Sequence, residues 1–159
     1  MGKVISWEEL AKVSEELKKQ GKKIVTTNGI FDLMHIGHVG FLKLAKQQGD
    51  VLFVGINSDE STRKLKGPTR PVFPQDQRAE ILAALEMVDY VAIFNETDPR
   101  AFLEQVKPHV HVKGDDYDPE KMVETPIVRK HGGEVRIVSF RPDSTTNIIN
   151  RIYNSAARK

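Results

Sequence analysis

The sequence predicts a doubly wound α/β fold, with about five parallel strands and helices on both faces of the sheet. Short runs rich in Val and Ile alternate with segments that have helical spacing of apolar residues. Such runs are typical of strands buried on both faces, and the right-handed crossovers between them place helices on the sheet. At 159 residues and 39% hydrophobic content, the chain is expected to form a single domain, 1–159, with its own core.

The first helix is expected over 6–20, packed on this domain. Ser6 and Glu9 form a capping box at its start, and Gly21 is a stop signal at its end. The predicted strands follow at five apolar runs, 23–27, 51–56, 90–94, 110–113 and 134–140.

Further helices are predicted where apolar residues recur at three- and four-residue spacing. These stripes include Phe41, Leu82, Leu103 and Ile149. The longest stretch without such a signal runs over 57–77, and we expect an irregular loop there, of a length that is usually functional or disordered.

Composition excludes several classes of protein. The 24 Lys and Arg residues against 22 Asp and Glu give a net charge of +2, too balanced for bulk nucleic-acid or anionic-membrane binding. The absence of cysteine excludes disulfides and thiolate chemistry. No apolar run approaches the ~18 residues of a membrane span, and the N-terminus lacks the apolar core of a signal peptide. We therefore expect a cytoplasmic protein with neither nucleic-acid nor membrane partners.

The segment after the first predicted strand is the first place to look for a site, because open parallel sheets bind ligands beyond the carboxyl ends of their strands. Asn28 and Gly29 permit a tight turn whose backbone N–H groups can face a phosphate. His35 and His38 then flank Gly37, and a helical first turn puts both imidazoles on one side. A helix N-terminus favours anions, so the segment predicts a phosphate-handling site.

Two other interpretations of the histidine pair stay open. A zinc site would need a third ligand, and His-x-x-His is not the i, i+4 spacing of the helical metalloprotease motif. An ordinary helix start that carries two imidazoles is the other, and the adjacent turn and Gly37 count against it. A dinucleotide fingerprint is excluded, since no G-x-G-x-x-G is present.

These residues resemble the nucleotidyltransferase superfamily whose signature is His-x-Gly-His, and within it the D-glycero-β-D-manno-heptose 1-phosphate adenylyltransferases. The similarity runs from about Ile5 to Ile152 and is carried by TNGIFDLMHIGHVGFL, GINSDESTRKLKGPTRP, QDQRAEILAALEMVDYVAIF, VKGDDYDPE and STTNIINRI. The resemblance implies a Rossmann-like fold and transfer of AMP from ATP to a sugar phosphate, giving ADP-heptose for a surface glycan such as lipopolysaccharide. It also implies a homo-oligomer, and Mg²⁺ held mainly by the triphosphate rather than by protein side chains.

The resemblance also implies roles for individual residues. The acceptor is itself a phosphate, with a second pKa near ~6, so it needs no general base. Neutralisation of charge and in-line positioning remain as the tasks of the protein. The predicted catalytic residues are His35, His38 and Lys66, and Asp32, Arg70 and Arg78 are predicted at the acceptor. Predicted nucleotide contacts are His35, His38, Asn28, Gly29, Ile30, Phe31, Lys64, Lys113, Gly114, Asp116, Ser144, Thr145 and Thr146.

Each role has a structural alternative. Lys64 and Lys66 also suit a solvated loop, and Arg70 suits a surface turn. Gly114 to Asp116 also reads as an ordinary turn, and one hydroxyl of 144–146 must cap the last helix.

Two positions depart from the heptose pattern where the family contacts the base. Asp115 replaces a usual glycine, and Arg141 matches the glycerol-3-phosphate cytidylyltransferases. A cytidylyltransferase that uses CTP and a polyol phosphate is therefore the enzymatic alternative, although KLKGPTRPV favours the heptose group. A nucleotide-binding module without catalysis is the non-enzymatic alternative.

Overall fold

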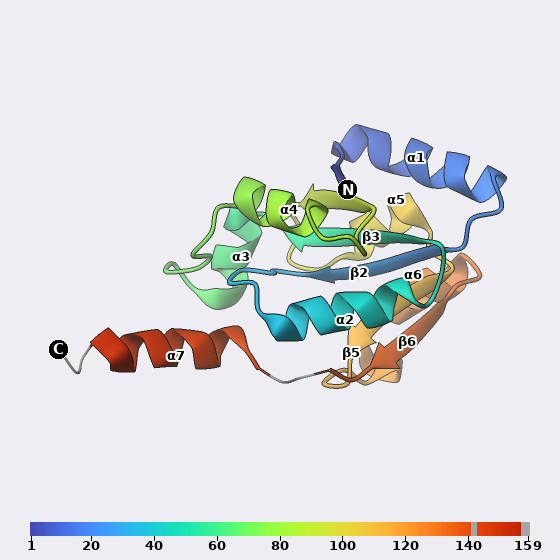
Figure 1. Ribbon diagram of the computed structural model, residues 1–159. Coiled ribbons are helices and arrows are strands. Elements are labelled where there is room, and N and C mark those ends of the chain that lie inside the picture. The colour runs from blue at the N-terminus through green and yellow to red at the C-terminus, as the bar shows by residue number, and fades with distance from the viewer. Residues whose placement is uncertain (141–142, 157–159) are drawn as a thin grey trace.

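Six parallel strands form the central sheet in the computed structural model, which describes residues 1–140 and 143–156 (Figure 1). The sheet order is β1-β4-β3-β2-β5-β6, and every neighbouring pair is parallel. The strands span Lys3–Val4 (β1), Ile24–Gly29 (β2), Val51–Asn57 (β3), Tyr90–Phe94 (β4), Val110–Gly114 (β5) and Glu134–Val138 (β6). The five predicted strands are confirmed. The edge strand β1 escaped prediction because two residues are too few to show a period.

Helices cover both faces of this sheet, as a doubly wound fold requires. They span Trp7–Lys19 (α1), Ile36–Lys46 (α2), Asp59–Lys66 (α3), Gln75–Ala83 (α4), Arg100–Val106 (α5), Glu124–Lys130 (α6) and Thr145–Ala156 (α7), with a 3₁₀ turn at Pro119–Lys121 (η1). Leu42 of α2 and Leu82 of α4 pack in one core cluster. Leu10 of α1, Phe102 of α5 and Val128 of α6 pack in a second.

Strand β3 shows why the two clusters lie on opposite faces. Successive side chains of a strand alternate between faces. Leu52 and Val54 belong to the cluster with α2 and α4, whereas Val51 and Phe53 belong to the cluster with α1, α5 and α6. The predicted fold class is confirmed.

Helix α3 corrects one expectation, since it forms inside the stretch 57–77 that we expected to be irregular. Ser58 caps the helix by accepting the N–H of Ser61, and Gly67 ends it with a φ of +94°. The buried side chains of α3 are Ser61 and Thr62, so its inner face is polar and an apolar period does not mark it. Lys64 and Lys66 therefore lie on a helix rather than on a loop.

The chain order in the sheet identifies where a ligand is expected. From β2 the chain moves outward to β3 and β4, then returns to place β5 on the other side of β2. The order thus reverses between β2 and β5, and open sheets bind ligands at the carboxyl ends of strands beside such a point. Helix α7 starts near this edge and extends away from the body of the molecule (Figure 1).

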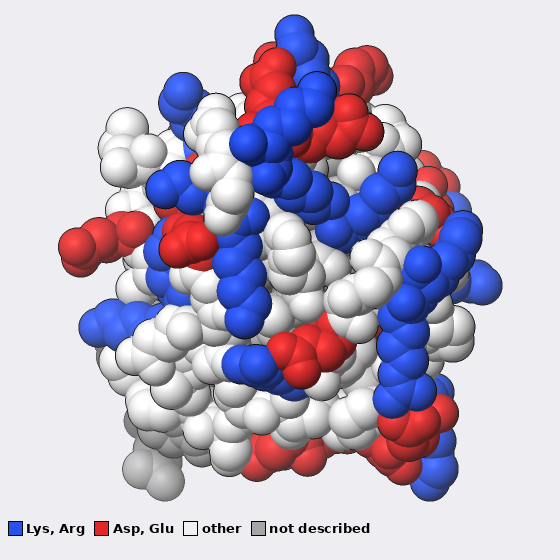
Figure 2. Space-filling view, turned by 90° about the vertical axis from the view of Figure 1, so that its right-hand side faces the viewer, with Lys and Arg blue, Asp and Glu red and all other residues white. Residues whose placement is uncertain are grey.

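The opposite edge of the sheet, where the strands begin, carries charges of both signs. Figure 2 shows Lys and Arg side chains there interspersed with Asp and Glu. Within the described ranges, no helix has the length and apolar character needed to cross a membrane.

Candidate active site

A cleft of about 580 Å³ opens at the carboxyl edge of the sheet. Its walls come from the β2–α2 connection, the ends of β3 and β5, helix α3 with the loop after it, the turn after β4 and the starts of α6 and α7. Of the predicted site residues, the cleft is lined by Asn28, Gly29, Ile30, Phe31, Asp32, His38, Lys66, Arg70, Lys113, Thr145 and Thr146. The predicted residues His35, Lys64, Arg78, Gly114, Asp116 and Ser144 lie outside this lining.

The two histidines form a stacked pair at the start of α2. Their ring centroids are 3.9 Å apart at an interplanar angle of 29°. His35 is the N-cap of the helix, and its Nδ1 accepts the N–H of Gly37 at 3.1 Å. A Cβ at Gly37 would lie 2.8 Å from the His35 ring and 3.0 Å from the carbonyl oxygen of Asp143, so only glycine admits this packing. His38 lines the cleft, and His35 stacks on it without being part of the cleft lining.

His38 is a neutral imidazole with one nitrogen left for a ligand. Burial, with a smaller contribution from His35, lowers the pKa of His38 to about 4. Its Nδ1 is buried and has no partner within the described ranges. The other ring nitrogen, Nε2, is then the one available to the cleft. A proton on Nε2 lets the neutral ring donate a hydrogen bond to a phosphate oxygen.

Asp32 anchors the loop that follows α3. The side chain is 2% exposed, and its carboxylate accepts the N–H groups of Val72 (2.9 and 3.0 Å) and Phe73 (2.9 Å). Asp32 also forms an ion pair with Arg70, with 2.9 Å between Oδ2 and Nε. These contacts hold Arg70 on the wall of the cleft, so Asp32 acts through the loop it fixes.

Arg78 is fully buried and joins three segments around the cleft. Its guanidinium donates to the carbonyl oxygens of Ile30 (2.6 Å) and Phe73 (3.0 Å), and pairs with Asp59 at 2.8 Å. Sequence reasoning predicted this cation at the acceptor phosphate. The structure places it among protein partners, in a role that positions the β2–α2 connection and the loop before α4.

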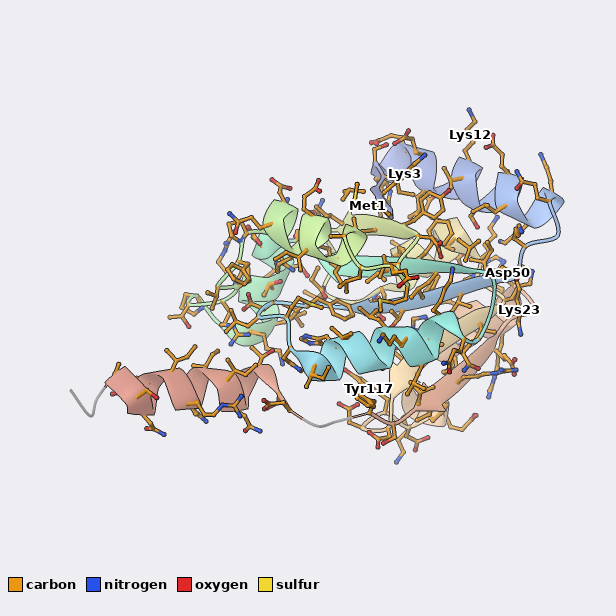
Figure 3. The ribbon with its side chains drawn as sticks, viewed as in Figure 1. Met1, Lys3, Lys12, Lys23, Asp50 and Tyr117 are labelled. Atoms are coloured by element: carbon orange, nitrogen blue, oxygen red, sulfur yellow. The ribbon has the colours of Figure 1, made fainter. Side chains whose placement is uncertain are left out.

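A second cation lies at the switch point, beside β2 and β5. Lys113 is 5% exposed, and its Nζ lies 3.1 Å from Asn28 Oδ1, 3.3 Å from Glu124 Oε1 and 4.5 Å from the centre of the Tyr117 ring. Burial lowers the pKa of Lys113, and Glu124 opposes that shift. Tyr117, labelled in Figure 3, follows β5 and lines the cleft with Lys113 and Glu124. This group offers a ring and a paired charge to a nucleoside.

The start of α7 brings hydroxyl groups to the cleft. Ser144 Oγ accepts the N–H of Asn147 at 3.2 Å and so caps the helix, as the sequence required of one hydroxyl in 144–146. Thr145 and Thr146 are left to line the cleft, and Thr145 Oγ1 lies 3.5 Å from the carbonyl oxygen of Leu33. Their contacts with a nucleotide stay predictions.

Two residues that depart from the heptose pattern have different outcomes. Ser139 donates a hydrogen bond to the carboxylate of Asp115, which is not part of the cleft lining. Arg141 lies outside the described residues. Lys64 pairs with Glu60 one helical turn away and is largely exposed, and its phosphate contact stays a prediction.

Sequence reasoning missed several residues of the cleft wall. These are Asn57, Leu65, Thr97, Asp98, Pro99, Tyr117 and Glu124. The position of Asn57, Thr97 and Asp98 just after the carboxyl ends of predicted strands was a usable signal. Glu124 carried none, because the short helix α6 shows no clear apolar period.

The cleft supplies no ready metal site. Among the described residues, no three His, Asp or Glu side chains gather in a way that could hold a metal ion. The cleft carboxylates Asp32, Asp98 and Glu124 each pair with a cationic side chain.

A parallel sheet with a histidine pair at its switch point defines an α/β protein built to handle nucleotides. The comparisons with known proteins agree with this class. Residues 26–151 match the model of the cytidylyltransferase-like family, and the chain belongs to that family. The family resemblance drawn from the five sequence segments is confirmed.

Several relatives are similar over nearly the whole chain. The bifunctional protein HldE of Geobacter metallireducens is 51% identical over 154 residues, which cover 96% of this chain and 31% of the relative. HldE of Alcanivorax borkumensis is 47% identical over 150 residues, which cover 94% and 32%. The chain thus spans about a third of the length of these bifunctional relatives.

Solved structures repeat the fold. The lipopolysaccharide core biosynthesis protein of Thermoplasma volcanium is 31% identical with a TM-score of 0.62, and the match covers 78% of this chain and all of that one. Pantoate-β-alanine ligase of Francisella tularensis, 18% identical with a TM-score of 0.64 over 90% of this chain and 69% of the ligase, shares the fold alone.

Proposed function

We propose that the chain is a nucleotidyltransferase that moves AMP from ATP to D-glycero-β-D-manno-heptose 1-phosphate, with ADP-heptose and pyrophosphate as products. The observation that carries this proposal is the position of His38, a neutral imidazole with a free nitrogen, at the helix N-terminus beside the switch point. The identity of about half with HldE supports the heptose acceptor, and the similarity to the lipopolysaccharide core biosynthesis protein supports a place in lipopolysaccharide synthesis. In such a bifunctional relative, this chain corresponds to one part.

The reaction needs charge stabilisation rather than proton abstraction. The acceptor phosphate is largely dianionic at neutral pH and attacks the α-phosphorus of ATP in line, while pyrophosphate leaves. His38 and the N-terminus of α2 stabilise the negative charge that builds on the α-phosphate. Lys66 and Arg70, which also line the cleft, hold phosphates. Mg²⁺ that arrives with ATP neutralises the triphosphate.

ATP is the proposed nucleotide because the departure at Asp115 does not reach the cleft wall. Its carboxylate accepts a hydrogen bond from Ser139, whereas Tyr117 and Lys113 form the wall at the switch point. CTP with glycerol 3-phosphate or another polyol phosphate is the second candidate, and Asp115 is the observation that favours it. A catalytically silent nucleotide-binding module is the third.

Pyrophosphate release tests the three candidates. Purified protein with Mg²⁺ is assayed with ATP or CTP against heptose 1-phosphate or glycerol 3-phosphate, with His38→Ala alongside. Turnover only with ATP and the heptose, lost in the variant, supports the proposal. Turnover with CTP contradicts the nucleotide assignment, and ATP binding without any turnover favours the silent module.

The proposal includes a homo-oligomer in the cytoplasm, where ATP is available. Support for self-association comes from α7, on which Ile152 is 60% exposed and Tyr153 is 74% exposed. A second copy of the chain would cover these exposed apolar side chains. Light scattering of the full chain, compared with Ile152→Ser, checks the assembly: a monomeric mass for the unmodified chain contradicts it.

A further inference from the structure

We propose that Asn57, Thr97 and Asp98 form a wall that binds the hydroxyl groups of a sugar phosphate acceptor. The inference rests on the proposed transfer to a sugar phosphate and assigns the half of the cleft that selects this substrate. We call these three residues the hydroxyl wall.

The order of the strands separates the two halves of the cleft. The nucleoside is expected at the switch point between β2 and β5, where Lys113 and Tyr117 line the cleft. The hydroxyl wall lies on the other side of β2, because Asn57 ends β3 and the other two residues follow β4. In-line transfer puts the attacking and leaving oxygens on opposite sides of the α-phosphorus, so the acceptor needs a subsite of its own.

Asn57 presents an acceptor atom to this subsite. The residue is 4% exposed, and its Nδ2 donates to Ser61 Oγ at 2.9 Å and to the carbonyl oxygen of Glu96 at 3.3 Å. Ser61 Oγ in turn donates to the same carbonyl at 2.6 Å. Because an amide has two N–H donors and both are used, its carbonyl oxygen is the polar atom left for a ligand. A carbonyl oxygen accepts a hydrogen bond from a hydroxyl group and repels a phosphate.

Asp98 and Thr97 extend the same chemistry. Arg100 orients the Asp98 carboxylate, with 2.8 Å from Nε and 2.9 Å from Nη2, and is itself more than half exposed. A carboxylate has about four lone-pair sites, so it still accepts hydrogen bonds from a ligand. Thr97 adds an exposed hydroxyl.

The cations on this half lie apart from the hydroxyl wall in the chain. Lys66 ends α3, and Arg70 is held by Asp32 in the loop that follows. The cations thus suit a phosphate and the hydroxyl wall suits hydroxyl donors, with Leu65 and Pro99 as apolar surface in the same cleft. A phosphorylated sugar with several free hydroxyls combines these groups. Inorganic phosphate has only the first.

Calorimetry without turnover tests the hydroxyl wall. The full chain is saturated with a non-hydrolysable ATP analogue and titrated with heptose 1-phosphate or with inorganic phosphate. In Asp98→Ala, we expect the affinity for heptose 1-phosphate to fall about tenfold or more, the usual effect of a lost hydrogen bond to a charged group. The affinities for inorganic phosphate and for the ATP analogue should stay within about twofold.

Two further variants make the test specific. Arg100→Ala removes the partner of Asp98 but keeps the carboxylate, so it should leave heptose 1-phosphate affinity within about threefold. Asn57→Ala should weaken heptose 1-phosphate binding as Asp98→Ala does, while unimpaired binding of the ATP analogue reports an intact fold.

The outcomes separate this inference from the proposed function. Loss of ATP-analogue affinity in Asp98→Ala, or unchanged heptose 1-phosphate affinity, overturns the hydroxyl wall. Failure of the unmodified chain to turn over heptose 1-phosphate, together with Asp98-dependent binding of another sugar phosphate, removes the proposed acceptor and supports the wall. Binding of inorganic phosphate alone, with no sugar phosphate bound, overturns the wall as well.

Discussion

Two sets of polar side chains at the same cleft differ in where their hydrogen bonds go. Asp32 and Arg78 are buried, and their hydrogen bonds go to the backbone. Asp32 accepts N–H groups of the loop before α4, and Arg78 donates to carbonyl oxygens of that loop and of the β2–α2 connection. His38 lies on the wall with its Nδ1 unpartnered in the described part of the chain, and Nε2 left to the cleft. The first set builds the site and the second is available to act in it. A charged residue in a functional motif therefore need not contact the ligand. Whether it can depends on how many of its hydrogen-bonding groups are already used by protein atoms.

The largest effect on stability is expected for Arg78, because its substitution removes buried contacts that hold the walls of the cleft together. Arg78→Met leaves Asp59 and the carbonyl oxygens of Ile30 and Phe73 without their buried partner. Breaking a buried ion pair from one side usually costs about 3–5 kcal/mol. We expect the free energy of unfolding in urea to fall by about this amount. The ATP affinity of the folded protein should change by less than about threefold.

A large loss of ATP affinity in folded Arg78→Met would show that Arg78 contacts the ligand, as we propose for His38. Lys12→Met, at an exposed position on α1, serves as the matched control for removal of a cation.

His38→Ala should give the opposite pattern, with a large loss of rate and little loss of stability. Removal of one preorganised donor to a developing charge commonly lowers the rate by on the order of 10²–10³-fold. The variant also removes a buried nitrogen that lacks a partner, which offsets part of the lost packing. We expect the free energy of unfolding to change by less than about 1 kcal/mol. Pyrophosphate release and urea unfolding measure the two quantities.

His131→Ala is the matched control, because this histidine pairs with Glu104 outside the cleft. If His38→Ala and His131→Ala lose rate equally, the loss does not report contact of His38 with the ligand.

Asp32 lies between the two extremes, since it is part of the scaffold yet holds a residue of the wall. Asp32→Asn keeps the shape but weakens the hydrogen bonds from Val72 and Phe73 and removes the ion pair with Arg70. We expect the KM for the acceptor to rise about tenfold and the free energy of unfolding to fall by about 1–3 kcal/mol. The KM for ATP should change less. Steady-state kinetics with each substrate varied in turn measures the split.

An equal rise of both KM values in Asp32→Asn would show that Asp32 supports the whole cleft rather than Arg70. Glu60→Gln, which breaks an exposed pair on α3, is the control and should leave both values unchanged.

Sequence and structure agree most closely where periodicity carries the information. The buried strands β3 and β4 are nearly continuous apolar runs, and β2 and β5 are rich in Val or Ile, so their positions follow from the sequence. Helix α3 was missed because its buried side chains are Ser61 and Thr62. The division of labour among Asp32, Arg78 and His38 was also beyond the sequence. It depends on partners up to 48 residues away that only the fold brings together.

Two histidines, His111 in the core and the partly buried His38, sharpen the comparison through pH. Burial lowers the pKa of His111 to about 3 and that of His38 to about 4, from an unfolded value of 6.5. Each has a ring nitrogen without a partner in the described ranges, but only His38 lines the cleft. Below pH 6.5 the unfolded chain binds more protons than the folded one, so stability is full above this pH and is lost as pH falls toward 4.

We therefore expect the free energy of unfolding to be lower at pH 5.5 than at pH 7, and His111→Gln to remove about 1 kcal/mol of that difference. This range stays above the carboxylate pKa values, so the histidines dominate it. His111 lies off the cleft, so a bound ATP analogue should leave its share of the pH-dependent difference in unfolding free energy unchanged. The share that His38→Ala removes should change when the analogue is bound. Urea unfolding at both pH values, with and without the analogue, measures this. Equal sensitivity of both shares to the analogue would mean that a position on the cleft wall does not separate His38 from His111.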